Sequence, residues 1–165
     1  PNKLENILKD DKDIIKIAKD IYSKDDMFFL GRGIDYPVAM EGSLKLKEIS
    51  YIHSEAYAAG ELKHGPIALI DEGFPVISII TDEVLAEKTI SNIQEVISRG
   101  AKTIVITNQH IDKDFNYQIK IPKTNKFLSP ILSVIPLQLL SYYVAKEKGL
   151  DVDKPRNLAK SVTVE

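Results

Sequence analysis

The stretch that decides the fold spans residues 27–51 and reads MFFLGRGIDYPVAMEGSLKLKEISY. It begins with an apolar run that has the length and composition of a buried strand. The tripeptide GRG at 31–33 ends this run, and the amphipathic segment over 35–51 predicts a long helix. A buried strand followed by a glycine turn and a helix is typical of a βαβ unit, so we expect a parallel sheet.

The same alternation of apolar runs and helical spacing continues on both sides of this stretch. Residues 4–22 have mostly helical spacing, with a possible break near 9–11. Further strands are predicted at 54–58, 75–80, 103–107 and, as an edge strand, 117–121, and helical segments at 65–70, 84–99 and 130–148. This alternation favours an α/β fold, a three-layer αβα sandwich with a five-stranded parallel sheet. Because right-handed crossovers place helices on both faces, we expect the flavodoxin-like order 2-1-3-4-5, with ligands beyond the carboxyl ends of the strands.

The composition is that of one globular domain. The chain has 165 residues, of which 44% are hydrophobic and 28% charged, and single domains typically contain roughly 100 to 200 residues. Cysteine is absent, which excludes disulfides, a thiol nucleophile and a Cys-ligated metal site. The net charge of -2 gives no electrostatic argument for nucleic acid or an anionic membrane as a partner.

Two features of the chain concern its location and its origin. The longest apolar runs fall short of the roughly 20 residues that a membrane span needs, and the charged N-terminal stretch is no signal peptide. We therefore expect a soluble, cytoplasmic protein. The sequence begins at Pro1 without an initiator Met, so we expect a piece of a longer polypeptide.

The glycines after the first predicted strand do not predict a cofactor. A dinucleotide-binding fingerprint, G-x-G-x-x-G, would need a third glycine where Tyr36 stands. The sequence also contains no P-loop. The alternative is a purely structural role, in which the two glycines let the chain turn sharply from strand to helix. We expect neither a nicotinamide nor any other cofactor.

The predicted helix over 35–51 carries a stripe of charged residues. Glu41, Lys45 and Glu48 are spaced i, i+4 and i+7, which places their side chains on one face. Such a stripe can be a solvated row of ion pairs, each worth about 0.2 to 0.5 kcal/mol. A partly buried lysine between two carboxylates would instead be a candidate set for proton transfer.

The histidines and the C-terminal tail allow two interpretations each. His53 and His64 bracket a segment without metal-ligand spacing, and His64 precedes Gly65-Pro66, which predicts a turn that the histidine could merely serve. His110 lies in a polar loop and is expected to be solvated. The last residues are polar and aperiodic, as in a disordered terminus. A tail that docks into a cleft would instead bring in Arg156, Asn157 and Lys160.

Three stretches of the sequence together resemble the glutamine:fructose-6-phosphate aminotransferases, also called glucosamine-6-phosphate synthases. They are FFLGRG at 28–33, VAMEGSLKLKEISYIHSEAYAAGELKHGP at 38–66 and KPRNLAKSVTVE at 154–165. The resemblance covers essentially the whole chain. Members of this family have an N-terminal glutaminase domain followed by two sugar isomerase (SIS) domains. The sequence resembles the second SIS domain, over 1–149, followed by a C-terminal catalytic tail over 150–165.

The resemblance implies roles for individual residues. It makes Glu48 the proton shuttle between C1 and C2 of the sugar, assisted by Lys45. It makes His64 the ring-opening histidine that is supplied to the neighbouring subunit's site, which implies a homodimer. It makes Lys160 the lysine that forms an imine with the ketose. The expected substrate-binding residues are Glu41, Arg156 and Asn157.

The loops after the strands depart from what a phosphosugar site on this fold usually needs. Such sites use a Ser/Thr-rich loop that holds the phosphate at a helix N-terminus. The corresponding loops here read GRG, TDE at 81–83 and TNQ at 107–109, and none is a convincing phosphate cradle. The resemblance implies that the first SIS domain of the parent chain holds the phosphate. We therefore expect the 165-residue chain alone to be inactive.

The sequence leaves two classes of function to compare. The first is the C-terminal half of an isomerase that converts fructose 6-phosphate and glutamine-derived ammonia to glucosamine 6-phosphate in amino sugar biosynthesis. The alternative is an SIS-type module for phosphosugar binding or dimerisation without catalysis. An imine-forming lysine in the tail favours the enzyme, since a sensor has no need of one. A stand-alone phosphosugar isomerase is disfavoured by the missing phosphate loop.

Overall fold

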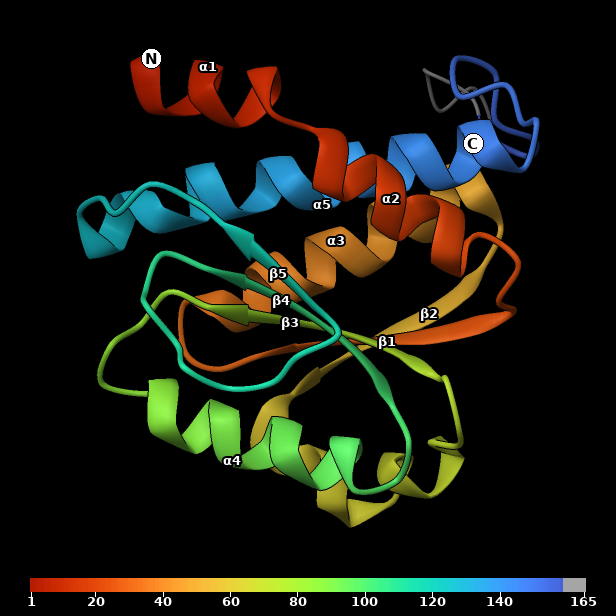
Figure 1. The fold of residues 1–165 in the computed structure, drawn as a ribbon. Coiled ribbons are helices and arrows are strands. Elements are labelled where there is room, and N and C mark those ends of the chain that lie inside the picture. Colours follow the sequence, from red (N-terminus) through yellow and green to blue (C-terminus); the bar gives the residue numbers. More distant parts are fainter. Residues whose placement is uncertain (159–165) are drawn as a thin grey trace, which may run out of the picture.

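A computed structural model describes residues 1–158 and shows helices on both faces of a central sheet (Figure 1). The five strands are all parallel, in the order β2-β1-β3-β4-β5. Their bounds are β1 Asp26–Gly31, β2 His53–Ala58, β3 Pro75–Ile80, β4 Lys102–Thr107 and β5 Tyr117–Lys120. The predicted architecture and strand order are therefore confirmed.

The helices follow the predicted segments closely. The α-helices are α1 Asn2–Lys9, α2 Lys12–Ile21, α3 Asp35–Ser50, α4 Ala86–Ile97 and α5 Ser129–Glu147, and the 3-10 helices are η1 Ala59–His64, η2 Pro66–Leu69 and η3 Lys126–Leu128. The break predicted near 9–11 separates α1 from α2. The helix η1 was not predicted, because a short 3-10 helix leaves no 3.6-residue period in the sequence.

The strands form the middle layer because they are buried on both faces. All six residues of β3 are buried, and successive side chains point to opposite faces of the sheet. Ile77 and Ile79 belong to the core shared with α1, α2, α3 and α5. Val76 and Ile80 belong to the second core, which α4 and η1 cover. Figure 1 shows α4 alone among the labelled helices on its side of the sheet.

Helix α5 is the most apolar helix and forms part of the first core. With the preceding turn, Lys126–Glu147, it is the one helix in the described part of the chain that is long and apolar enough to cross a membrane. Its buried side chains, among them Leu137, Leu140 and Val144, pack in the core against α3 and α2. The composition of α5 is thus explained by its place between other helices.

Two buried serines provide a test of this packing. Ser78 in β3 is fully buried, and within the described residues its hydroxyl has no hydrogen-bond partner. Ser43 in α3 is equally buried, but its hydroxyl lies 3.0 Å from that of Ser54. Leaving a buried polar group unpaired costs about 1 to 3 kcal/mol. We therefore expect Ser78→Ala to raise the free energy of unfolding by about 1 kcal/mol, and Ser43→Ala to lower it by a similar amount.

Urea denaturation of both variants and of the unmodified chain measures this difference. Each variant loses the same single oxygen atom, so the comparison isolates the effect of hydrogen bonding. An equal loss of stability in the two variants would show that the Ser78 hydroxyl does have a partner.

Candidate active site

The charged stripe on α3 forms a connected set of ion pairs. The Lys45 ammonium lies 2.7 Å from a carboxylate oxygen of Glu48 and 3.8 Å from one of Glu41. All three side chains are partly exposed. The hydrogen bond that Lys45 donates to Glu48 is the main cause that raises the pKa of Lys45, while partial burial opposes it. Lys45 therefore stays protonated, and Glu48 is the member of the pair that can accept a proton.

Helix α3 ends at Tyr51, which holds an unusual backbone conformation. Its φ of 59° lies in the left-handed region, where glycine is the common residue after a helix. The Tyr51 amide donates to the Lys47 carbonyl and thereby closes the last turn. Because the helix ends here, the Tyr51 side chain can contact another segment of the chain.

That segment is the C-terminal tail. The backbone N–H of Arg156 donates to the Tyr51 hydroxyl at 2.8 Å, and its guanidinium carbon lies 4.1 Å from the centre of the Tyr51 ring. A guanidinium over an aromatic face is attracted by the ring, by about 0.5 to 1 kcal/mol at an exposed site. The tail thus docks onto the end of α3 as far as the structure describes it.

The docked tail forms one wall of an open cavity beside Glu48. The cavity measures about 620 Å³ and is lined by the last turns of α3 and by the tail: Glu48, Ile49, Val152, Asp153, Lys154, Pro155 and Leu158. Asn157 follows Arg156 with a positive φ of 62°. Lys160 lies outside the described residues. The structure thus brings Glu48, Lys45 and the tail together, and Tyr51 is the member of this site that the sequence did not predict.

His64 lies elsewhere in the fold. It ends η1, which packs against α4 on the face of the sheet opposite α3. Its Nδ1 lies 2.9 Å from a carboxylate oxygen of Glu61, and both side chains are exposed. Within one chain the structure therefore does not bring His64 to Glu48.

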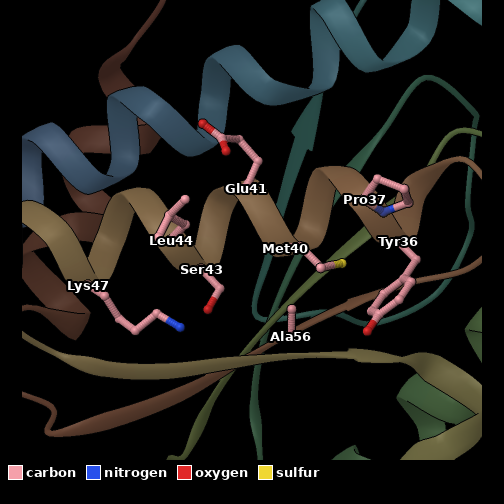
Figure 2. A pocket seen from close by; sticks show the side chains of 8 residues that line it. All are labelled: Tyr36, Pro37, Met40, Glu41, Ser43, Leu44, Lys47 and Ala56. Carbon is pink, nitrogen blue, oxygen red and sulfur yellow. The ribbon is translucent and has the colours of Figure 1, made fainter. Parts of the chain in front are cut away.

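A second hollow lies between α3 and the edge strand β2 (Figure 2). It measures about 510 Å³ and its lining includes Met40, Leu44 and Ala56. Glu41 is also one of the lining residues, although Figure 2 shows its carboxylate directed to the side of α3 away from β2. The Lys47 ammonium donates to the Ser54 carbonyl at 2.9 Å and so binds the helix to the strand. This mostly apolar hollow offers little to a polar substrate, and the cavity beside Glu48 is the better candidate.

No group of three or more His, Asp or Glu side chains that could hold a metal ion occurs among residues 1–158. The charged residues that line the cavity are Glu48, Asp153 and Lys154, and the Lys45 ammonium donates a hydrogen bond to Glu48. A carboxylate and an ammonium ion in contact are suited to proton transfer at a carbon next to a carbonyl or imine.

Comparison with known proteins identifies the family to which the chain belongs. The model of the SIS domain family matches residues 20–147. The chain belongs to the SIS domain family. A glutamine–fructose-6-phosphate aminotransferase (isomerizing) of Clostridium tetani is 64% identical over all of this chain, which spans 28% of that relative's length.

Two solved structures are similar to this chain over most of its length. The C-terminal domain of a glucosamine-fructose-6-phosphate aminotransferase from Francisella tularensis is 45% identical, with a TM-score of 0.87 over 92% of this chain and 43% of that one. A glucosamine-6-phosphate deaminase from Thermotoga maritima is 29% identical, with a TM-score of 0.70 over 95% of this chain and 48% of that one. The chain is thus about half as long as either.

The pairing of Lys45 with Glu48 predicts that the pKa of Lys45 is raised in the folded chain. We expect the Lys45 ammonium to lose its proton at a pH above its ordinary value of 10.5, because the negative charge of Glu48 stabilises the protonated form. The stability that the pair contributes is then complete below 10.5 and is lost as the pH rises through the higher pKa of the folded chain. NMR of the Lys45 side chain across this range measures the shift, and Glu48→Gln should reduce it. A Lys45 pKa unchanged by Glu48→Gln would contradict the assignment of the pair.

The contact between Tyr51 and the tail predicts a local effect. Tyr51→Leu removes the hydrogen bond to Arg156 and the aromatic face, so we expect amide exchange in the tail up to residue 158 to accelerate several-fold, while the sheet is unaffected. Tyr22→Leu, a partly exposed tyrosine at the end of α2, serves as the matched control. Hydrogen exchange with mass spectrometry reads out both variants. Equal tail exchange in the two variants would show that Tyr51 does not hold the tail.

Proposed function

We propose that this SIS domain is the second half of the isomerase part of a glutamine:fructose-6-phosphate aminotransferase. The observation that carries the proposal is the Lys45–Glu48 pair beside a cavity that the C-terminal tail lines. The product would be glucosamine 6-phosphate, made from fructose 6-phosphate and glutamine-derived ammonia. Since the chain spans 28% of the Clostridium tetani relative, the glutaminase and first SIS domains are partners in the parent chain.

In the proposed reaction the tail supplies the covalent step. The Lys160 amine adds to the C2 carbonyl of the open-chain sugar, water leaves, and an imine forms. Ammonia then replaces the lysine at C2 and regenerates the free amine. The lysine needs a lowered pKa to act as a nucleophile at neutral pH, and Arg156, four positions earlier in the sequence, would supply a cationic group that favours the neutral amine.

Glu48 performs the proton transfer that follows. It removes a proton from C1 and delivers one to C2, while the C1 hydroxyl loses a proton and the nitrogen gains one. The C2 imine thereby becomes an amine and the C1 alcohol an aldehyde, with no change in the number of protons. Helix α3 holds the carboxylate rigidly, and Lys45 orients it through its 2.7 Å contact. A rigid carboxylate suits transfer between adjacent carbons on one face of the sugar.

His64 supports a homodimer in the same proposal. Its side chain is exposed and lies on the face of the sheet opposite Glu48, so it can reach a sugar only in a site that another domain or subunit completes. A C2 dimer, the commonest soluble assembly, would place it at the partner's site as the ring-opening group. The proposal also includes a cytoplasmic location, which suits a chain without cysteine.

A non-catalytic SIS module for phosphosugar binding or dimerisation is the second candidate. The mostly apolar hollow between α3 and β2, with Met40 and Leu44 exposed, favours it as a contact surface. Such a module would require neither the Glu48 carboxylate nor a lysine at 160. Substitution at these two positions therefore distinguishes the two candidates.

The decisive substitutions belong in the complete enzyme that contains this domain. Lys160→Arg keeps the charge but cannot form the imine, so borohydride trapping of fructose 6-phosphate should be abolished. Glu48→Gln should still allow trapping but lower the rate by about 10² to 10⁴, the usual contribution of a general acid or base. Lys146→Arg and Glu87→Gln, both exposed, are the matched controls and should behave as the unmodified enzyme. Full trapping by the lysine variant or normal turnover by the glutamine variant would refute that residue's role.

A further inference from the structure

The carboxyl ends of β1 and β3 meet where the connections leave the sheet in opposite directions. The chain passes from β1 to α3 on one face and from β3 to α4 on the other. In an open α/β sheet this switch point is where ligands bind. In this chain the switch point is occupied by a side chain of the protein. Asp35, in the first turn of α3, is only 3% exposed.

The Asp35 carboxylate accepts hydrogen bonds from the residues that follow β3. One oxygen accepts from the backbone N–H of Thr81 at 2.8 Å and from that of Asp82 at 3.3 Å. The other oxygen accepts from the Thr81 hydroxyl, which lies 3.0 Å from the hydroxyl of Ser129. Both carboxylate oxygens act as acceptors, as an ionised group requires.

These donors are of the kind that hold a phosphate. Successive backbone N–H groups after a strand, together with nearby hydroxyls, form an anion-binding concavity. The tight turn between β1 and α3 places Asp35 next to these donors. A Cβ on Gly31 would lie 2.4 Å from the Asp35 carbonyl oxygen and 2.7 Å from the Tyr36 nitrogen. Gly31 thus permits a turn tight enough for the first turn of α3 to reach the end of β3.

A second carboxylate at the same place, that of Asp82, is already paired with a cation. Asp82 is 5% exposed and binds the Lys126 ammonium at 2.9 Å, which is the main cause that lowers its pKa. Burial raises the pKa of Asp35, and the hydrogen bonds from Thr81 oppose that effect. A sugar phosphate entering the switch point would meet two buried acidic groups and one lysine.

We infer that Asp35 is an internal anion that fills the phosphate-type site at the switch point of this SIS domain and keeps sugar phosphates out of it. This explains how the domain keeps the fold of phosphosugar enzymes while its loops lack the usual phosphate cradle. The phosphate of a substrate would then be bound outside this chain. The reacting part of that substrate would occupy the cavity beside Glu48, near the amino edge of the sheet. The inference about Asp35 stands independently of the proposed reaction.

Removing the carboxylate should uncover the site. In Asp35→Ser the N–H groups of Thr81 and Asp82 lose their acceptor, so inorganic phosphate should bind there with a dissociation constant in the millimolar range. NMR titration of the 165-residue chain with phosphate, against chloride at equal ionic strength, follows the amide signals of these two residues. We expect saturable shifts in the variant and none in the unmodified chain. Asp71→Ser, which removes an exposed loop carboxylate, should behave as the unmodified chain.

Either of two results would overturn the inference. Saturable phosphate shifts at Thr81 and Asp82 in the unmodified chain would show that Asp35 does not exclude the anion. A folded Asp35→Ser chain without such shifts would show that the donors form no anion site. If the variant is unfolded in chloride, binding to the native state should restore its cooperative melting in phosphate, and absence of that rescue would also refute the inference. None of these measurements involves catalysis, so failure of the proposed reaction would be recognised separately.

Discussion

Asp35 holds the first turn of α3 to the end of β3 through its hydrogen bonds with Thr81 and Asp82, and the rest of the helix takes its position from there. A helix that follows a parallel strand must run back across the sheet before the next strand begins. The two ends of α3 therefore lie at opposite edges. At the carboxyl edge the helix carries Asp35, and near the amino edge it carries Glu48 and Tyr51.

This arrangement separates two tasks that phosphosugar enzymes often combine in one place. The carboxyl edge has the donors for a phosphate, but Asp35 already occupies them. Near the amino edge lie a carboxylate and an ammonium group beside a cavity that the tail helps to form. A domain built in this way can offer reactive groups to a substrate that is anchored elsewhere. His64 fits the same division, because η1 presents it on the opposite face of the sheet.

Buried polar groups in this domain differ in how well they are paired. Asp35, Thr81 and Ser129 form a connected set at one end of the sheet, and Ser43 pairs with Ser54 between α3 and β2. Such sets fix the relative position of elements because an unpaired member would cost about 1 to 3 kcal/mol. The apolar cores on the two faces supply most of the stability, whereas these polar contacts determine where α3 lies on the sheet.

Local patterns in the sequence were enough to predict the helices and strands and, through them, the topology. Apolar runs such as 75–80 define buried strands, and the crossover rule then orders them. The spacing of Glu41, Lys45 and Glu48 placed these residues on one helix face, because that requires only the helical period. Tertiary structure alone decided that Asp35 binds Thr81, since their hydrogen bonds join residues 46 positions apart. Tertiary structure likewise decided that Tyr51 adopts a left-handed backbone conformation and that its hydroxyl accepts a hydrogen bond from Arg156, 105 positions further along the chain. Such contacts depend on how distant segments approach one another, and no local period in the sequence records that approach.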